Sequence, residues 1–197
     1  MSNTVKELTL LLPDSLLFGS FIFGIGTLSV QHSVLFFSLL ESLLVLVGLN
    51  NVFSFINGKE LTKCHSKLHT LLFEELVSSP SANNVSYGVY LLSFASSYFL
   101  SSYYNLQNEL EVLDPSYTNT LTILGISFVL FFYSMLRIMF SCDSLMSVLL
   151  GLFFGLLVGI VIQYQNVNIV GRDSINFLGI PLLRNKSVNG QPIYICS

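Results

Sequence analysis

The sequence predicts an all-α, polytopic membrane protein with about five transmembrane helices. Its 197 residues are 52% hydrophobic and only 10% charged, and their mean hydropathy of +0.72 lies above the range of ordinary soluble domains. The chain also contains five apolar stretches close to the roughly 20 residues that a helix needs to cross a bilayer. These stretches cover residues 14–30, 33–56, 86–104, 120–141 and 145–163.

The first two spans are joined only by Gln31 and His32, which predicts a tight antiparallel hairpin. The first span is short and rich in glycine, so we expect its helix to begin near Leu8, with Pro13 in its first turn. The polar connection 57–85 that follows the hairpin is expected to contain a short amphipathic helix.

The third span is rich in serine and aromatic residues, and an acidic loop with Glu109, Glu111 and Asp114 leads from it to the fourth. The fifth span ends in a polar tail outside the membrane. The predicted organisation is a three-helix unit at 1–104, a two-helix extension at 105–163 and an extramembrane tail at 164–197.

Charged residues and cysteines exclude several classes of function. The chain has a net charge of −3 with eight Lys and Arg, so it lacks the basic surface that nucleic-acid binding requires. Cys64, His65 and His69 are close in sequence, but no third or fourth metal ligand accompanies them. The three cysteines are too few and too scattered for a disulfide framework or for iron–sulfur ligation. We therefore expect no metal or cofactor in this chain.

One carboxylate, Glu41, lies near the middle of the second apolar span, "HSVLFFSLLESLLVLVGLNN". An acidic side chain at the bilayer centre costs about 2.5–3.5 kcal/mol even on the lenient insertion scale, so it is retained for a use. Its length does not let it reach the interface, and it is expected to face protein or water. Glu41 is interpreted as a proton-relay group, and the alternative is a neutral residue that hydrogen-bonds two helices together.

The fifth span carries a stripe of small residues at four-residue spacing. The stripe consists of Ser147, Gly151, Gly155 and Gly159, which fall on one helical face and allow another helix to approach closely. Just before this span, Arg137 and Asp143 are placed either to pair with each other or to line the interface.

Residues 17–56 resemble the first hairpin of subunit 4L of respiratory complex I, the bacterial K subunit. Gly24, Ile25 and Gly26 match the end of that family's first helix, and Glu41 matches its buried glutamate. A Leu-Asn pair, here Leu49 and Asn50, follows in both.

The third span, through "LLSFASSYFLSS", is similar to the family's third helix. Tyr98 stands where the family has a second glutamate, and a phenol can still pass a proton by donating and accepting hydrogen bonds. Two further spans and the tail, in residues 105–197, have no counterpart in the three-helix subunit.

The resemblance implies a membrane-arm subunit of a proton-pumping NADH:ubiquinone oxidoreductase, with Glu41 and Tyr98 as relay groups. It also implies other membrane subunits as partners and a place in the mitochondrial inner membrane, encoded by an organellar genome. Two alternatives stay open. One is subunit 6 of the same complex, which has five spans and whose second helix "HSVLF" would suit. The other is a structural membrane protein of a large DNA virus, in which Glu41 and the glycines serve packing only.

Overall fold

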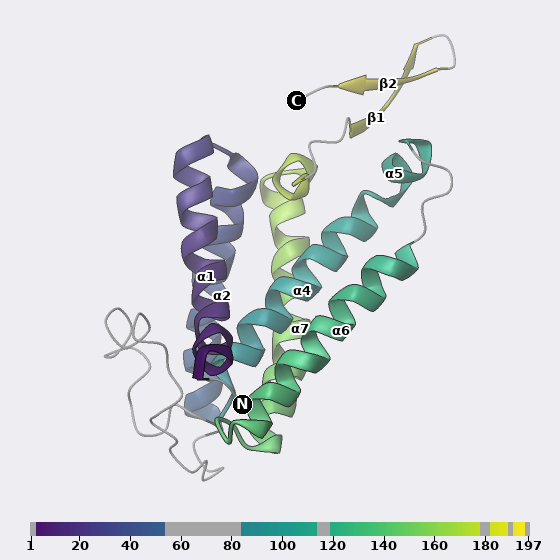
Figure 1. The fold of residues 1–197 in the computed structure, drawn as a ribbon. Helices are drawn as coiled ribbons and strands as arrows, with labels where there is room; N and C mark the ends of the chain where they lie inside the picture. The colour runs from purple at the N-terminus through teal and green to yellow at the C-terminus, as the bar shows by residue number, and fades with distance from the viewer. Residues whose placement is uncertain (1–2, 54–83, 114–118, 178–181, 189–190, 196–197) are drawn as a thin grey trace.

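A computed structural model describes residues 3–53, 84–113, 119–177, 182–188 and 191–195 of the chain. These residues form a bundle of long helices that run between two ends, called here the lower and upper ends as drawn in Figure 1. The predicted all-α membrane class is confirmed, because four helices are long and apolar enough to cross a membrane. Their apolar segments are Lys6–Thr27, Val30–Val52, Thr120–Met139 and Leu145–Ile169.

The first helix, α1 (Asn3–Thr27), begins earlier than predicted. Pro13 therefore lies inside the helix and not in its first turn. A proline at this place removes one backbone hydrogen bond from the preceding turn, and the residue that follows it, Asp14, is turned into the bundle and almost fully buried.

The second helix, α2 (Val30–Val52), runs antiparallel to α1, as the predicted hairpin requires. The turn is not at Gln31 and His32, however, because both lie in the first turn of α2. Leu28, with a φ of +51°, makes the turn, and the hydroxyl of Ser29 lies 2.9 Å from Nδ1 of His32.

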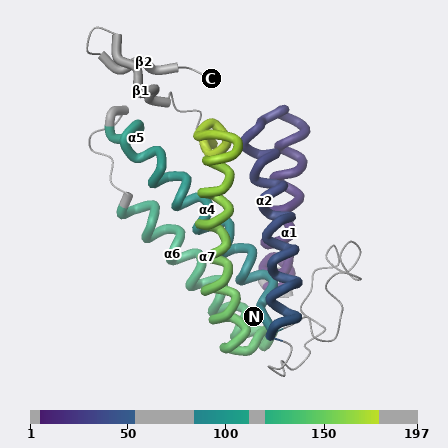
Figure 2. The backbone as a smooth tube through the Cα atoms, turned by 180° about the vertical axis from the view of Figure 1, so that it is seen from behind, coloured from purple at the N-terminus to yellow at the C-terminus, as the bar shows by residue number. Residues whose placement is uncertain are grey.

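The helix α4 (Tyr87–Asn105) lies at the centre of the bundle and contacts α1, α2, α6 and α7. It is not among the four helices apolar enough to be candidate spans, yet it runs from the lower to the upper end (Figures 1 and 2). Every residue from Tyr87 to Tyr98 is buried. A polar helix is stable here because the apolar helices around it separate it from lipid.

A short helix, α5 (Gln107–Leu113), follows at the upper end, and α6 (Asn119–Met139) returns to the lower end. The last long helix, α7 (Leu145–Ile169), continues past the predicted end at residue 163 and leads to a short 3-10 helix, η1 (Arg172–Ile175). The largest helix–helix interface joins α4 and α7. The fifth span therefore packs against the third span within the bundle.

The region predicted as an extramembrane tail, 164–197, contains both β-strands of the described part of the chain. β1 (Leu182–Val188) and β2 (Gln191–Ile195) pair antiparallel, with an irregularity between Arg184 and Ser187. This hairpin lies at the upper end, beyond the helices (Figure 1).

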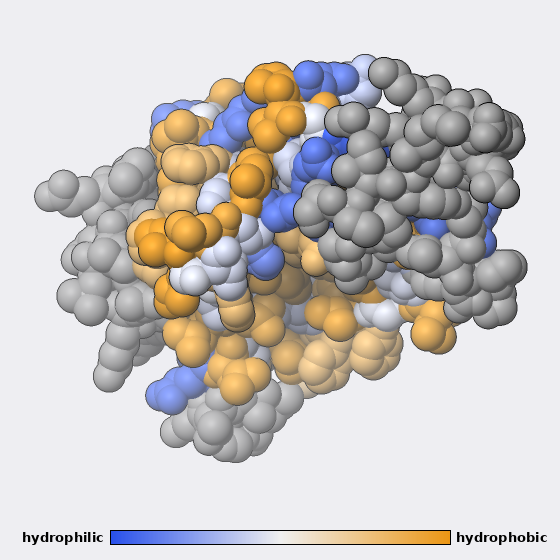
Figure 3. Space-filling model, turned by 90° about the horizontal axis from the view of Figure 1, so that it is seen from above, coloured by the Kyte–Doolittle hydropathy of each residue, from blue (hydrophilic) through white to orange (hydrophobic). Residues whose placement is uncertain are grey.

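Large apolar side chains are exposed along α1, α2, α6 and α7, as a lipid-facing surface requires. Figure 3, which looks onto the upper end, shows such side chains around the flanks of the bundle. The expected helix in 57–85, together with Cys64, His65 and His69, falls outside the described residues.

Candidate functional site

The candidate site is the set of polar groups on α4 and the side chains that meet them from neighbouring helices. A hydroxyl buried in a membrane helix needs a partner, and two serines of α4 donate to carbonyls of their own helix. Ser97 bonds the carbonyl of Phe94 at 3.0 Å, and Ser102 bonds that of Tyr98 at 2.8 Å. Tyr90 instead reaches α2, where its hydroxyl donates to the carbonyl of Ser42 at 2.9 Å. These bonds let a serine- and tyrosine-rich helix occupy the core.

Tyr98, one of the two predicted relay residues, is fully buried at the centre of this set. Its hydroxyl accepts a hydrogen bond from Nδ2 of Asn166 on α7 at 3.0 Å. The same Nδ2 also donates to the hydroxyl of Ser38 on α2 at 2.6 Å. Asn166 therefore joins α2, α4 and α7 through one buried amide, a contact that the sequence did not reveal.

Glu41 is half-buried at the edge where α2 meets α7. Its Oε1 accepts a long hydrogen bond, 3.4 Å, from Nε2 of Gln165. Glu41 does face a neighbouring helix, as expected, but it is not enclosed by the bundle.

The two predicted relay residues lie close without a hydrogen bond between them among the described residues. Gln165, the partner of Glu41, is followed in the chain by Asn166, the partner of Tyr98. On α2, Ser38 precedes Glu41 by one turn and meets the same Asn166. A proton could pass between the two residues only with movement of these side chains or with an intervening water.

Toward the upper end, the polar groups continue along α4 and α7. Ser101 donates to Oε1 of Gln163 at 2.8 Å, and this glutamine is almost fully buried. Beyond it, Arg172 of η1 pairs with the buried Glu109 of α5, with Nη1 2.8 Å from Oε1. Arg172 also donates to the carbonyl of Asn105. Glu109, which the sequence indicated only as part of an acidic loop, is thus held at the end of α4.

At the lower end, a second polar cluster involves a carboxylate that was not among the predicted site residues. Oδ1 of Asp14 accepts a hydrogen bond from the Tyr87 hydroxyl at 2.9 Å. Next to Tyr87 in the chain, Ser86 donates to Oδ2 of Asp143 at 2.7 Å. Of the two alternatives for Arg137 and Asp143, the structure shows the pairing, because Arg137 Nε lies 2.6 Å from the same Oδ2.

The small-residue stripe of α7 packs directly on the backbone of α4. A methyl group added at Gly155 would lie 2.5 Å from the carbonyl oxygen of Tyr90, and one at Gly159 equally close to that of Phe94. At Gly151 the nearest atom, the Ser86 carbonyl oxygen, would be 3.0 Å away. Ser147, the fourth member, accepts a backbone hydrogen bond from the amide of Ser86 at 3.1 Å. The expectation that the stripe faces another helix is confirmed, and its partner is within this chain.

Two further features bear on cofactors. Among the described residues, no group of three His, Cys, Asp or Glu side chains could hold a metal ion. Cys142 is disulfide-bonded, a bond not expected from the cysteine count.

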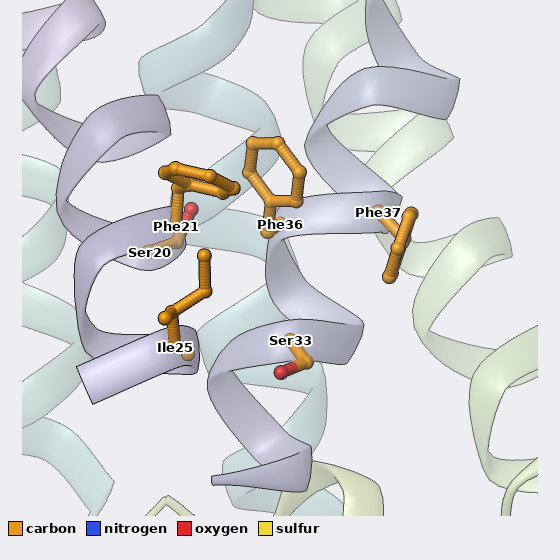
Figure 4. Close-up of a pocket in the computed structure, with 7 residues that line it drawn as sticks. Ser20, Phe21, Ile25, Ser33, Phe36 and Phe37 are labelled. Carbon is orange, nitrogen blue, oxygen red and sulfur yellow. The ribbon is translucent and has the colours of Figure 1, made fainter. Parts of the chain in front are cut away.

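A shallow pocket of about 230 Å³ lies between α1 and α2. Figure 4 shows that aromatic and aliphatic side chains surround it, with two serine hydroxyls among them. Its lining consists of Ser20, Phe21, Gly24, Ile25, Ser33, Phe36 and Phe37. Such a surface suits a hydrocarbon chain and not a polar substrate.

No protein-family model, curated protein or solved structure matches this chain. Its function is therefore inferred from its own residues and their arrangement.

Proposed function

We propose that this chain is a membrane-arm subunit of a proton-pumping NADH:ubiquinone oxidoreductase and that polar groups around α4 serve proton transfer. The observation that carries the proposal is α4 itself, a serine- and tyrosine-rich helix buried between apolar helices over Tyr87–Tyr98. Buried polar groups are expensive within a membrane, and proton pathways are a use that repays this cost. The resemblance of residues 17–56 to subunit 4L supports the same conclusion.

Between the two subunits of this complex considered from the sequence, the number of helices favours subunit 6. Subunit 4L has three helices, whereas here α6 and α7 pack on α4 together with α1 and α2. A five-helix bundle with a shared core agrees better with a five-span subunit than with a three-helix unit that carries an extension. Subunit 6 is therefore the second candidate, beside the subunit 4L position that the resemblance of residues 17–56 implies.

The place of Glu41 supports membership in a larger assembly. A carboxylate at the bilayer centre costs about 2.5–3.5 kcal/mol, and one long hydrogen bond from Gln165 offsets only part of this. Because Glu41 is half-exposed at the outer edge of α2 and α7, a neighbouring subunit can cover it and exchange protons with it. Inward transfer would then reach the Tyr98 hydroxyl through an intervening water, while the Asn166 amide holds that hydroxyl in place.

Replacement of Glu41 tests the relay. Glu41→Gln keeps the shape and the hydrogen-bonding groups but cannot release a proton, so we expect the complex to assemble and to oxidise NADH with fewer protons pumped per electron. The measurement is the proton-to-electron ratio of the purified complex in liposomes. The control is Glu111→Gln, an exposed carboxylate on α5. An unchanged ratio for Glu41→Gln would remove the relay role.

Copurification tests the assembly and the proposed location in the mitochondrial inner membrane. An affinity tag on the full chain, followed by mild solubilisation, is expected to bring down NADH dehydrogenase subunits and their NADH-oxidising activity. Recovery with viral capsid proteins would instead support the structural alternative and overturn the proposal.

A further inference from the structure

Asp14 is a second carboxylate inside the bundle, and the proposed relay does not use it. It is 1% exposed although it lies within the apolar segment Lys6–Thr27 of α1. Tyr87 of α4 donates a hydrogen bond to its Oδ1 at 2.9 Å. A buried carboxylate is either stabilised by such donors or kept neutral by a proton, and the group can change between the two states.

Tyr133 of α6 provides an independent observation at the same place. Its side chain is 4% exposed, and its hydroxyl makes no hydrogen bond within the described part of the chain. The hydroxyl lies against Gly88 of α4, where an added methyl group would collide with it and would also lie 3.2 Å from Cγ of Pro13. Because Gly88 has no side chain, the Tyr133 hydroxyl fits between Gly88 and Pro13. Gly88 follows Tyr87 in the chain and Pro13 precedes Asp14, so the hydroxyl lies beside both residues of the hydrogen bond.

The charged groups around this spot come from the lower end of the bundle. Tyr133 interacts electrostatically with Asp14, Arg137 and Asp143. Arg137 and Asp143 form the buried ion pair that connects α6 with the start of α4 through Ser86.

The remaining elements around α1 contribute no further charge at this position. Among the described residues, α4 contributes no charged side chain and α7 has Tyr164 as its titratable group. The ionisable groups of α2 are His32, at the opposite end of the bundle, and Glu41, at the edge with α7.

We propose that Asp14, Tyr87 and Tyr133 form a proton-binding site at the lower end of the bundle, through which protons enter the polar core around α4. A hydronium ion from the aqueous side supplies the proton, an O–H bond forms on the Asp14 carboxylate, and water is released. Each phenol donates one proton while it accepts another, so neither gains net charge. Tyr90, Ser93 and Ser97 continue the buried hydroxyls along α4 toward Tyr98.

The role in pumping rests on the proposed function, whereas proton binding by Asp14 does not. Infrared difference spectra of the full chain in lipid nanodiscs, with carbon-13 label in aspartate, test the binding directly. Acid-minus-alkaline spectra are expected to contain a carboxyl band that Asp14→Asn abolishes and that the exposed-site control Asp173→Asn retains. A band unaffected by Asp14→Asn would overturn the site.

Two conservative variants test the phenols. Tyr87→Phe and Tyr133→Phe remove one hydroxyl each and keep the ring, so folding should persist. Tyr87→Phe is expected to shift the Asp14 carbonyl band to higher frequency, because the Tyr87 hydroxyl donates a hydrogen bond to that group and such a bond weakens the carbonyl. Tyr133→Phe is expected to leave this frequency unchanged, since the Tyr133 hydroxyl makes no hydrogen bond within the described part of the chain. Its part in the site is tested by proton pumping in the assembled complex, where an unchanged proton-to-electron ratio would remove Tyr133 from the site.

The assembled complex then tests the role in pumping. Asp14→Asn and Tyr133→Phe are expected to lower the proton-to-electron ratio, and Asp173→Asn is expected to leave it unchanged. A retained infrared band without copurifying NADH dehydrogenase would contradict the proposed function but not the proton site. If NADH dehydrogenase copurifies but Asp14→Asn leaves the infrared band in place, the proton site is contradicted and the proposed function is not.

Discussion

Gly155→Leu is expected to prevent the chain from accumulating in a folded form, and Gly155→Ala to lower the free energy of unfolding by about 1–3 kcal/mol. The reason is the approach of α7 to α4, where a methyl group at Gly155 would lie 2.5 Å from the Tyr90 carbonyl oxygen and 2.7 Å from Cβ of Ser93. Neither neighbour can move away alone, since both belong to the helix at the centre of the bundle. Far-UV circular dichroism during unfolding by SDS in mixed micelles measures the loss.

Gly125→Leu on α6 is the matched control, because nothing lies within 4 Å of a methyl group built there. Within the stripe, Gly151→Ala should be the mildest change, since its nearest contact is 3.0 Å. Equal stabilities of Gly155→Ala, Gly125→Ala and the unaltered chain would show that the two helices are not in close contact. The expected consequence is loss of the fold, because the helix that the stripe contacts is α4 of the same chain.

The sequence predicted those features that depend on local spacing. The four-residue spacing placed the glycines on one face of α7. Arg137 and Asp143 are only six positions apart on either side of a turn, so their pairing was a local possibility. The apolar stretches predicted the four lipid-facing long helices because a helix exposed to lipid needs about 20 largely apolar residues. The turn at Leu28 shifted because a residue in the left-handed region closes the hairpin before His32.

The sequence did not predict features that depend on which helices are neighbours. Tyr98 lies against Asn166, far along the chain, and no local pattern specifies that contact. The least apolar long helix, α4, is the most enclosed because its hydroxyls find partners on surrounding helices, an outcome that hydropathy cannot reveal. Asp14 was overlooked because it follows Pro13 near the start of an apolar stretch and resembles a flanking charge, whereas α1 begins at Asn3.

Asp143→Ala is expected to destabilise the chain by about 3–5 kcal/mol, because removal of one partner leaves the other charge buried without compensation. The side chains of Arg137 and Asp143 are 6% and 10% exposed, and Nε lies 2.6 Å from Oδ2. That Oδ2 also accepts from Ser86, so the same substitution releases the start of α4 from the connection between α6 and α7. SDS unfolding in micelles gives the magnitude, with Asp173→Ala as the exposed control.

A double variant separates the charge from the packing at this place. In Arg137→Met with Asp143→Leu, no buried charge remains, and replacement of a buried ion pair by apolar residues is often neutral or stabilising. We therefore expect most of the lost stability to return, with a remaining deficit of about 1 kcal/mol for the Ser86 hydrogen bond. If the double variant is as unstable as Asp143→Ala, the pair acts through the shape of the turn at Ser141, whose φ is +53°, and not through its charges. Recovered stability with a lowered proton-to-electron ratio would assign the pair to proton entry at Asp14 and Tyr133, since the fold would then no longer require it.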